Sequence, residues 1–164
     1  MISHTASKII LLVVAAAVFG AACGFGPKRD RFFWKKNRMD IITLSEKVLV
    51  ISNKTGFTTF TMDSVGPDFK RQIAVTDASA KYPELADDIK QIGNKIKLIG
   101  YHWITLKPSY IAIFKSGGLG TDTVLLRLLT DDGLSEFAKD FKEYGLVVQE
   151  TMELEKNWLF VYTD

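Results

Sequence analysis

The sequence predicts an α+β domain, a mostly antiparallel sheet with two amphipathic helices packed on one face, preceded by an N-terminal membrane-targeting segment. Three observations lead to this fold class. Short apolar runs typical of strands follow one another between turn residues. Two longer stretches instead repeat apolar residues every three or four positions, as amphipathic helices do. Most of the predicted strands follow one another directly, as in antiparallel hairpins. We therefore expect the helices to cover a largely antiparallel sheet.

The length and composition of the chain favour one folded domain. Its 164 residues are enough for one hydrophobic core and too few for two domains of ordinary size. Apolar residues make up 47% and charged residues 24%, which is typical of a folded protein rather than a disordered one. We therefore predict a signal peptide or membrane anchor over residues 1–22, a lipid-anchored basic and aromatic collar over residues 23–40, and a single α+β domain over residues 41–164.

The first predicted elements of the domain form a hairpin. The stretch "KVLVISNKTGFTTFTMD" is interpreted as a strand over residues 47–52, a turn over residues 53–56 and a second strand over residues 57–63. The following segment is irregular, and residues 72–76 are a candidate short strand.

Residues 83–100 have the pattern of an amphipathic helix. Pro83 suits a first helical turn, Asp87 and Asp88 lie early, and Gly100 ends the stretch. The apolar residues that recur along it are Leu85, Ile89, Ile92, Ile96 and Ile99. This spacing places them on one face of the helix.

A second amphipathic helix is predicted over residues 131–145. Asp131 or Asp132 is expected to cap its start, and Gly145 to end it. Its apolar face consists of Leu134, Phe137, Ala138, Phe141 and Tyr144. Because Phe137 and Phe141 lie one turn apart, we expect both to be buried against the sheet.

The remaining strands are predicted from apolar runs between turn residues. Three strands over residues 101–107, 110–116 and 121–130 lie between the two helices and are separated by "PS" and "GGLG". Two more, "LVVQET" and "NWLFVYT", follow the second helix and are joined by the polar stretch "MELEKN". The last strand carries apolar residues on both faces, which indicates that both of its faces are buried.

The N-terminal apolar run has the size of a signal-peptide core. Residues 9–19, "IILLVVAAAVF", are 11 apolar residues that follow a short segment ending in Lys8. Extended to Phe25, the run reaches 17 residues, the lower limit for a spanning helix, and its second half is rich in alanine and glycine. As a spanning helix it is marginal.

The only cysteine of the chain follows this run. Gly20, Ala21 and Ala22 precede Cys23, and with them the segment resembles the precursor of a bacterial lipoprotein, in which small residues precede a cysteine that is acylated and becomes the new N-terminus. The resemblance covers residues 1–24 and departs from the family pattern at Gly20, where leucine is usual. It implies a lipid attached to Cys23 and a domain on the periplasmic face of the cell envelope. An acylated sulfur also avoids an unpaired thiol in an exported protein.

The collar is the most basic part of the chain. Residues 28–40 hold six basic and two acidic residues, whereas residues 41–164 hold 14 basic and 17 acidic residues. A nucleic-acid-binding protein would carry its basic patch on the folded domain, so we expect no nucleic-acid partner. A membrane surface fits better, because the basic residues lie beside the apolar run. The predicted membrane-surface contacts are Lys28, Arg29, Arg31, Phe32, Phe33, Trp34, Lys35, Lys36 and Arg38.

The same charges support an alternative topology. Positive charges that flank a spanning helix stay on the cytoplasmic side, and the collar outweighs Lys8. An uncleaved helix would therefore make a single-pass membrane protein with a cytoplasmic domain. Membrane attachment is common to both interpretations.

Candidate catalytic motifs are few. The glycine-rich stretch "SGGLGTDT" (residues 116–123) lacks the Gly-Lys-Ser/Thr ending of a phosphate-binding loop and leads into a strand, which favours a hairpin loop. His102 is the only histidine beyond the predicted signal segment, so the sequence offers neither a triad nor a metal site built on histidine pairs. The Asp87–Asp88 and Asp131–Asp132 pairs fall at helix starts, where the helix dipole favours negative charge.

These observations favour binding over catalysis. We expect a membrane-anchored, non-catalytic protein-interaction domain, an accessory subunit of an envelope or membrane protein complex. Its expected partners are membrane lipid and another protein, with no catalytic residues, metal or cofactor. The alternatives are a membrane-tethered immunity or inhibitor protein, a small-ligand or lipid-binding domain, and an enzyme whose site uses Asp, Lys, Tyr and Ser without histidine.

Overall fold

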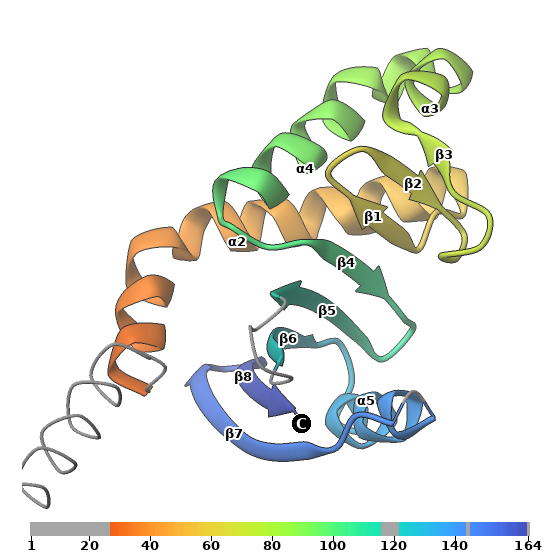
Figure 1. The fold of residues 1–164 in the computed structure, drawn as a ribbon. Helices are drawn as coiled ribbons and strands as arrows, with labels where there is room; N and C mark the ends of the chain where they lie inside the picture. The colour runs from red at the N-terminus through yellow and green to blue at the C-terminus, as the bar shows by residue number, and fades with distance from the viewer. Residues whose placement is uncertain (1–26, 116–121, 144, 164) are drawn as a thin grey trace, which may run out of the picture. The chain divides into compact units, whose positions relative to one another are not determined.

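The computed structural model describes residues 27–115, 122–143 and 145–163. These residues form four α-helices, one 3-10 helix and one eight-stranded antiparallel sheet with the strand order β3-β2-β1-β4-β5-β6-β8-β7 (Figure 1). The α+β class and the antiparallel sheet are therefore confirmed. The chain divides into two compact units, residues 1–35 and 36–164. The described part of the first unit is the N-terminal end of helix α2, and the sheet belongs to the second unit.

The helices and strands have the following bounds. The helical elements are α2 (Pro27–Thr55), α3 (Val75–Lys81), η1 (Pro83–Leu85), α4 (Ala86–Leu98) and α5 (Gly133–Lys142). The strands are β1 (Thr59–Thr61), β2 (Ser64–Gly66), β3 (Ile73–Ala74), β4 (Trp103–Leu106), β5 (Tyr110–Lys115), β6 (Asp122–Leu128), β7 (Val148–Glu155) and β8 (Trp158–Thr163).

Helix α2 corrects the predicted hairpin. The strand expected over residues 47–52 and the turn over residues 53–56 are wrong, because α2 continues to Thr55. Apolar residues recur at helical spacing through this stretch and are at most 2% exposed: Ile41, Leu44, Val48 and Ile51. Burial of this face overrides the strand preference of a run rich in valine and isoleucine. Gly56 ends the helix with a φ of 73°, and β1 retains the centre of the second predicted strand.

The segment before α4 is more helical than expected. The candidate strand over residues 72–76 is reduced to the two residues of β3. The short helix α3 follows it directly and was not predicted. Its Ala78 is fully buried, and the Ser79 hydroxyl bonds back to the Val75 carbonyl within the helix.

Both predicted amphipathic helices are confirmed. Elements η1 and α4 occupy residues 83–98, and the five apolar residues predicted for their inner face are at most 6% exposed. Helix α5 occupies residues 133–142, and Asp132 takes the N-cap position, although its side chain makes no capping hydrogen bond. Phe137 is fully buried as predicted, whereas Phe141 is half-buried.

The predicted strands that follow α4 are also present. Strands β4, β5 and β6 pair in antiparallel order, and β8 lies between β6 and β7. Both faces of β8 are buried as predicted, because Val161 belongs to the cluster beneath α5 and Phe160, on the opposite face, is only 1% exposed. Strand β7 extends to Glu155, so it takes in most of the polar stretch predicted as a connection. The turn into β8 places Asn157 at a φ of 67°. The glycine-rich residues 116–121 lie outside the described residues.

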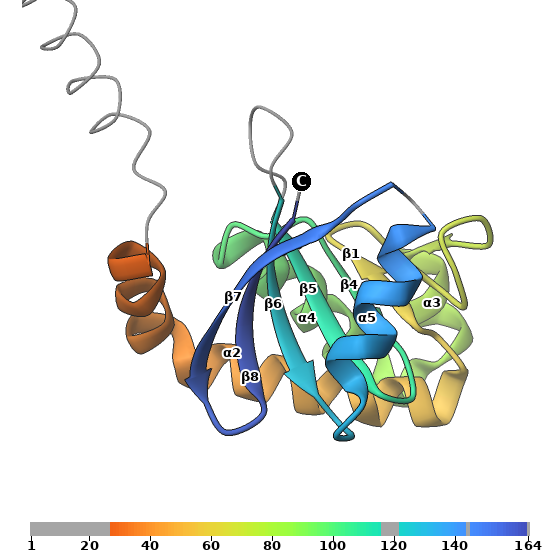
Figure 2. The same ribbon diagram turned by 90° about the horizontal axis from the view of Figure 1, so that it is seen from below.

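The two predicted helices lie on opposite faces of the sheet, which corrects the expectation that they share one face (Figure 2). Helix α5 packs on one face, where the Phe137 ring lies 5.5 Å from Tyr110 and 6.4 Å from Phe114 between centroids. On β5 these aromatic residues alternate with Ile111 and Ile113, which point to the other face and are also fully buried. A strand that is apolar on both faces needs a cover on each.

Helices α2 and α4 cover the second face. Arg127 of β6, which is adjacent in sequence to Leu126 beneath α5, points to the opposite side and donates a hydrogen bond to the Ser45 hydroxyl of α2 at 2.7 Å. Helix α4 is joined to α2 by the ion pairs Lys47–Asp88 and Lys95–Asp40. These pairs are partly exposed and contribute little to stability, so the buried apolar faces hold the two helices together.

Candidate functional site

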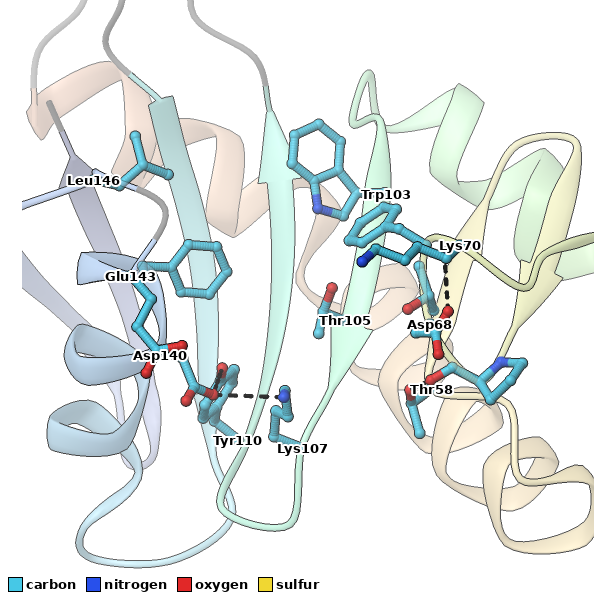
Figure 3. Close-up of a pocket in the computed structure, with 14 residues that line it drawn as sticks. Thr58, Asp68, Lys70, Trp103, Thr105, Lys107, Tyr110, Asp140, Glu143 and Leu146 are labelled. Carbon is cyan, nitrogen blue, oxygen red and sulfur yellow. Dashed lines mark hydrogen bonds and ion pairs between the residues drawn. The ribbon is translucent and has the colours of Figure 1, made fainter.

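A groove opens beside α5 on the face of the sheet that this helix covers only in part. Thr105 of β4 pairs with Ala112 of β5, so its side chain points to the same face as the cluster beneath α5. That cluster comes from β5, β6, β8 and α5, whereas β4 and β1 continue the sheet beyond it. The uncovered part forms a groove of about 660 Å³, bounded by α5 on one side and by the loop of residues 67–72 on the other (Figure 3).

Aromatic rings form a large part of this groove. The Trp103 ring stacks on Phe114 with centroids 4.8 Å apart and an interplanar angle of 12°. Phe141 of α5 approaches Phe114 at 5.0 Å, and Phe69 of the 67–72 loop meets Trp103 edge-on at 6.0 Å. Phe69 is 56% exposed. The groove therefore offers aromatic surface from the sheet, the helix and the loop.

The 67–72 loop holds Phe69 through contacts of the residues around it. The Asp68 carboxylate accepts backbone hydrogen bonds from Lys70 and Arg71, each at 2.9 Å, and pairs with the Arg71 guanidinium at 2.6 Å. The hydrogen bond from Arg71 holds the pKa of the Asp68 carboxyl below its ordinary value. A Cβ on Gly66 would lie 2.4 Å from the Arg71 carbonyl oxygen, so the loop can fold back onto β2 only because residue 66 has no side chain.

The loop wall of the groove carries an unpaired cation. In Figure 3 the Lys70 side chain extends from the loop toward the space between the walls. No described residue forms an ion pair with its ammonium group, whereas the Arg71 guanidinium is already paired with Asp68. On the α5 wall, the exposed Glu143 carboxylate likewise has no partner within the described part of the chain. The two walls thus carry opposite unpaired charges.

The floor of the groove contains an unsatisfied hydroxyl. Thr105 is only 8% exposed, and its Oγ1 forms no hydrogen bond with any described residue. Figure 3 places this side chain between the α5 wall and the loop wall. A buried polar atom without a partner costs on the order of 1–3 kcal/mol. Because Oγ1 itself is covered by its neighbours, this hydroxyl is a buried atom beneath the floor and is not exposed to the groove.

Asp140, Tyr110 and Lys107 meet at one end of the groove. The Tyr110 hydroxyl donates a hydrogen bond to Asp140 at 2.8 Å, and the Lys107 ammonium lies 3.7 Å from the same carboxylate. Tyr110 is fully buried. These are residue types of the enzyme alternative. Their contacts, however, satisfy the carboxylate and connect β5 and the turn before it to α5.

Most predicted membrane contacts lie in the first turns of α2. Phe32 is 70% exposed, Phe33 is half-buried and Trp34 is 5% exposed. Arg38 makes two hydrogen bonds to Glu155 of β7, at 2.5 and 3.2 Å, so its charge is balanced within the domain. Cys23 and the apolar run lie outside the described residues, and membrane contact stays a prediction. No helix in the described ranges combines the length and the apolar character needed to cross a membrane.

The other candidate residues lie apart from the groove lining. His102 is exposed, and its backbone N–H bonds to the Phe114 carbonyl. Asp88 pairs with Lys47, and Asp132 accepts a hydrogen bond from the Thr130 hydroxyl. Within residues 27–115, 122–143 and 145–163, no three His, Cys, Asp or Glu side chains are grouped so that they could hold a metal ion.

Sequence reasoning missed the groove itself. The loop wall was not predicted, because the stretch between the second predicted strand and the candidate strand over residues 72–76 is irregular. One signal was present in the neighbouring strand, where Trp103 and Thr105 alternate with the buried Ile104 and Leu106. A second was Phe69, an aromatic residue in an otherwise polar stretch.

Comparisons with known proteins found no matching family model, no matching curated protein and no matching solved structure. The groove must therefore be interpreted from its own chemistry.

Proposed function

We propose that the chain is a membrane-anchored, non-catalytic protein-interaction domain, and that the groove beside α5 is the surface that binds its partner. The observation that carries the proposal is the aromatic surface that the sheet, the helix and the exposed Phe69 of the loop together offer in one groove. Binding surfaces are enriched in aromatic residues. An accessory subunit of an envelope or membrane complex needs such a surface.

The chemistry of the groove supports binding more than catalysis. The Asp140 carboxylate accepts a hydrogen bond from Tyr110 and lies close to Lys107. A general base needs to reach a proton of the bound substrate, and a carboxylate held by its neighbours is less suited to that role. The full burial of Tyr110 favours a structural role for its hydroxyl as well.

Membrane attachment is proposed from the N-terminal sequence. Acylation of Cys23 would place the collar at the bilayer surface, and one acyl chain together with a basic segment gives stable anchoring. Replacing Cys23 by serine should abolish labelling with a fatty-acid analogue and leave an unprocessed precursor. Recovery of the N-terminal peptide "MISHTASK" from the mature wild-type protein would instead favour an uncleaved helix and a single-pass topology.

Purification from solubilised membranes tests the role of the groove. The tagged full-length chain should co-purify with a stoichiometric protein partner, and Phe69→Ala should lose this partner because it removes the exposed ring of the loop wall. Leu98→Ala is the matched control, since Leu98 is 71% exposed at the end of α4. Retention of the partner by Phe69→Ala, or equal loss by both variants, would overturn the assignment of the groove.

A small-ligand function is the second candidate. The groove volume of about 660 Å³ falls in the range of small-molecule sites, roughly 300–1,000 Å³. Mass spectrometry of the intact protein under native conditions would detect a retained small molecule. Its loss from Phe69→Ala but not from Leu98→Ala would favour this candidate.

A further inference from the structure

We propose that the groove recognises a partner segment in which an aromatic side chain stands next to a carboxylate. This inference rests on the proposed function and specifies the chemistry of the partner. It combines two features of the groove: its aromatic surface and the charge of Lys70, which has no partner among the described residues.

The aromatic side chain of the partner is assigned to the space between Phe69 and Phe141. Phe69 stands edge-on to Trp103, and Trp103 and Phe141 both contact Phe114 beneath them. A ring entering from solvent can therefore meet ring edges and ring faces at once, the arrangement that aromatic pairs prefer. Aromatic residues that fill such pockets commonly act as the anchors of protein interfaces.

The carboxylate is assigned to the loop wall. Lys107 lies 3.7 Å from Asp140, and Arg71 is paired with Asp68, so neither offers a free charge. The Lys70 ammonium is the unpaired cation of the groove lining, as far as the described residues show, and it adjoins Phe69 in the sequence. An acidic residue beside the anchoring ring would reach it.

The opposite wall determines the direction of the segment. Glu143 on the α5 side has no cationic partner within the described ranges. A carboxylate placed against this wall would be repelled, and a neutral or basic residue would be accepted. The groove therefore favours a segment whose acidic end faces the 67–72 loop.

Peptide selection on the full-length chain tests the inference. Random 12-residue displayed peptides would be panned against the detergent-solubilised protein, and the enriched peptides sequenced. We expect enrichment of Phe, Tyr or Trp next to Asp or Glu. Phe69→Ala should abolish the aromatic enrichment, and Lys70→Glu should change the enriched neighbour from acidic to basic while the aromatic residue is retained.

A charge-reversal control completes the design. Lys90→Glu reverses an exposed charge on α4 and should leave the selection unchanged. All variants should melt within a few degrees of the wild type.

Three results would overturn the inference. These are peptides that lack the aromatic residue, an acidic preference that persists in Lys70→Glu, and no enrichment over Phe69→Ala. If the Phe69-dependent partner still co-purifies from membranes in any of these cases, the proposed function stands and only the recognition chemistry fails. If the selection succeeds and no partner co-purifies, the recognition chemistry stands and the proposed function fails.

Discussion

The hydroxyl of Tyr110 donates a hydrogen bond of 2.8 Å to the carboxylate of Asp140, which joins β5 to α5 beside the groove. Tyr110→Phe removes the donor and should lower the free energy of unfolding by about 1.5–3 kcal/mol, as expected for a hydrogen bond to a charged group. Asp140→Asn keeps an acceptor and should cost less. Urea unfolding of the three proteins measures both effects, and a wild-type midpoint for Tyr110→Phe would show that this contact does not hold α5.

The two phenylalanines of α5 should differ when truncated. Phe137 is fully buried, so Phe137→Ala should cost roughly 3–5 kcal/mol, because it leaves a cavity between α5 and the sheet. Phe141 is half-buried and lines the groove, so Phe141→Ala should cost less stability and should weaken partner binding instead. Thermal unfolding and co-purification measure the two effects. Equal loss of stability in both variants would contradict this difference.

Gly93 of α4 tests the contact between this helix and the segment after β1. An alanine in an exposed helix interior normally stabilises by up to about 1 kcal/mol relative to glycine. Here the added Cβ would lie 2.4 Å from the Met62 carbonyl oxygen, so Gly93→Ala should destabilise the protein. Asn94→Ala, at the neighbouring exposed position, is the control and should be neutral or slightly stabilising. Calorimetry that finds Gly93→Ala more stable than the wild type would contradict the close approach.

The 67–72 loop should respond to acid through Asp68. Because the hydrogen bond from Arg71 lowers the pKa of this carboxyl, the loop contacts are complete above the ordinary carboxyl pKa of about 4 and are lost as the pH falls through the lowered value. Amide exchange of Lys70 and Arg71 reports on them. After correction for the intrinsic exchange rates, we expect the protection of these two amides to stay constant from pH 7 to pH 5 and to fall in stronger acid. In Asp68→Ala the same two amides should be unprotected over the whole pH range. A change in their protection between pH 7 and pH 5 in the wild-type protein would contradict the role of Asp68.

The helices show what could be predicted from local pattern. Residues 83–98 were predictable because start signals, apolar spacing and a stop residue agree, as they do for α5. The α2 segment around Val48 was misassigned because its β-branched residues favour a strand, while its helical spacing is decided by burial against the sheet. Continuous apolar runs such as "YIAIF" imply that helices cover both faces of the sheet, because alternate residues of a strand face opposite sides.

The groove depends on contacts that sequence pattern does not encode. The position of Phe69 depends on the Asp68–Arg71 pair and on the missing side chain of Gly66. The burial of the Thr105 hydroxyl without a partner depends on how its neighbours pack over it. Both are properties of the packed domain. The polar and aromatic residues of β4 were visible in the sequence, but their shared face became meaningful only with the strand order.

Site-specific photo-crosslinking tests the central claim most directly. A benzophenone amino acid at position 69 of the full-length chain, in its native membrane, should crosslink to one protein, because this position lies exposed on the loop wall of the groove. The same group at position 90, on an exposed face of α4, should not. A single adduct from position 69 that is lost in Lys70→Glu is the predicted result. No adduct from position 69, or the same adduct from both positions, would contradict a partner-binding groove.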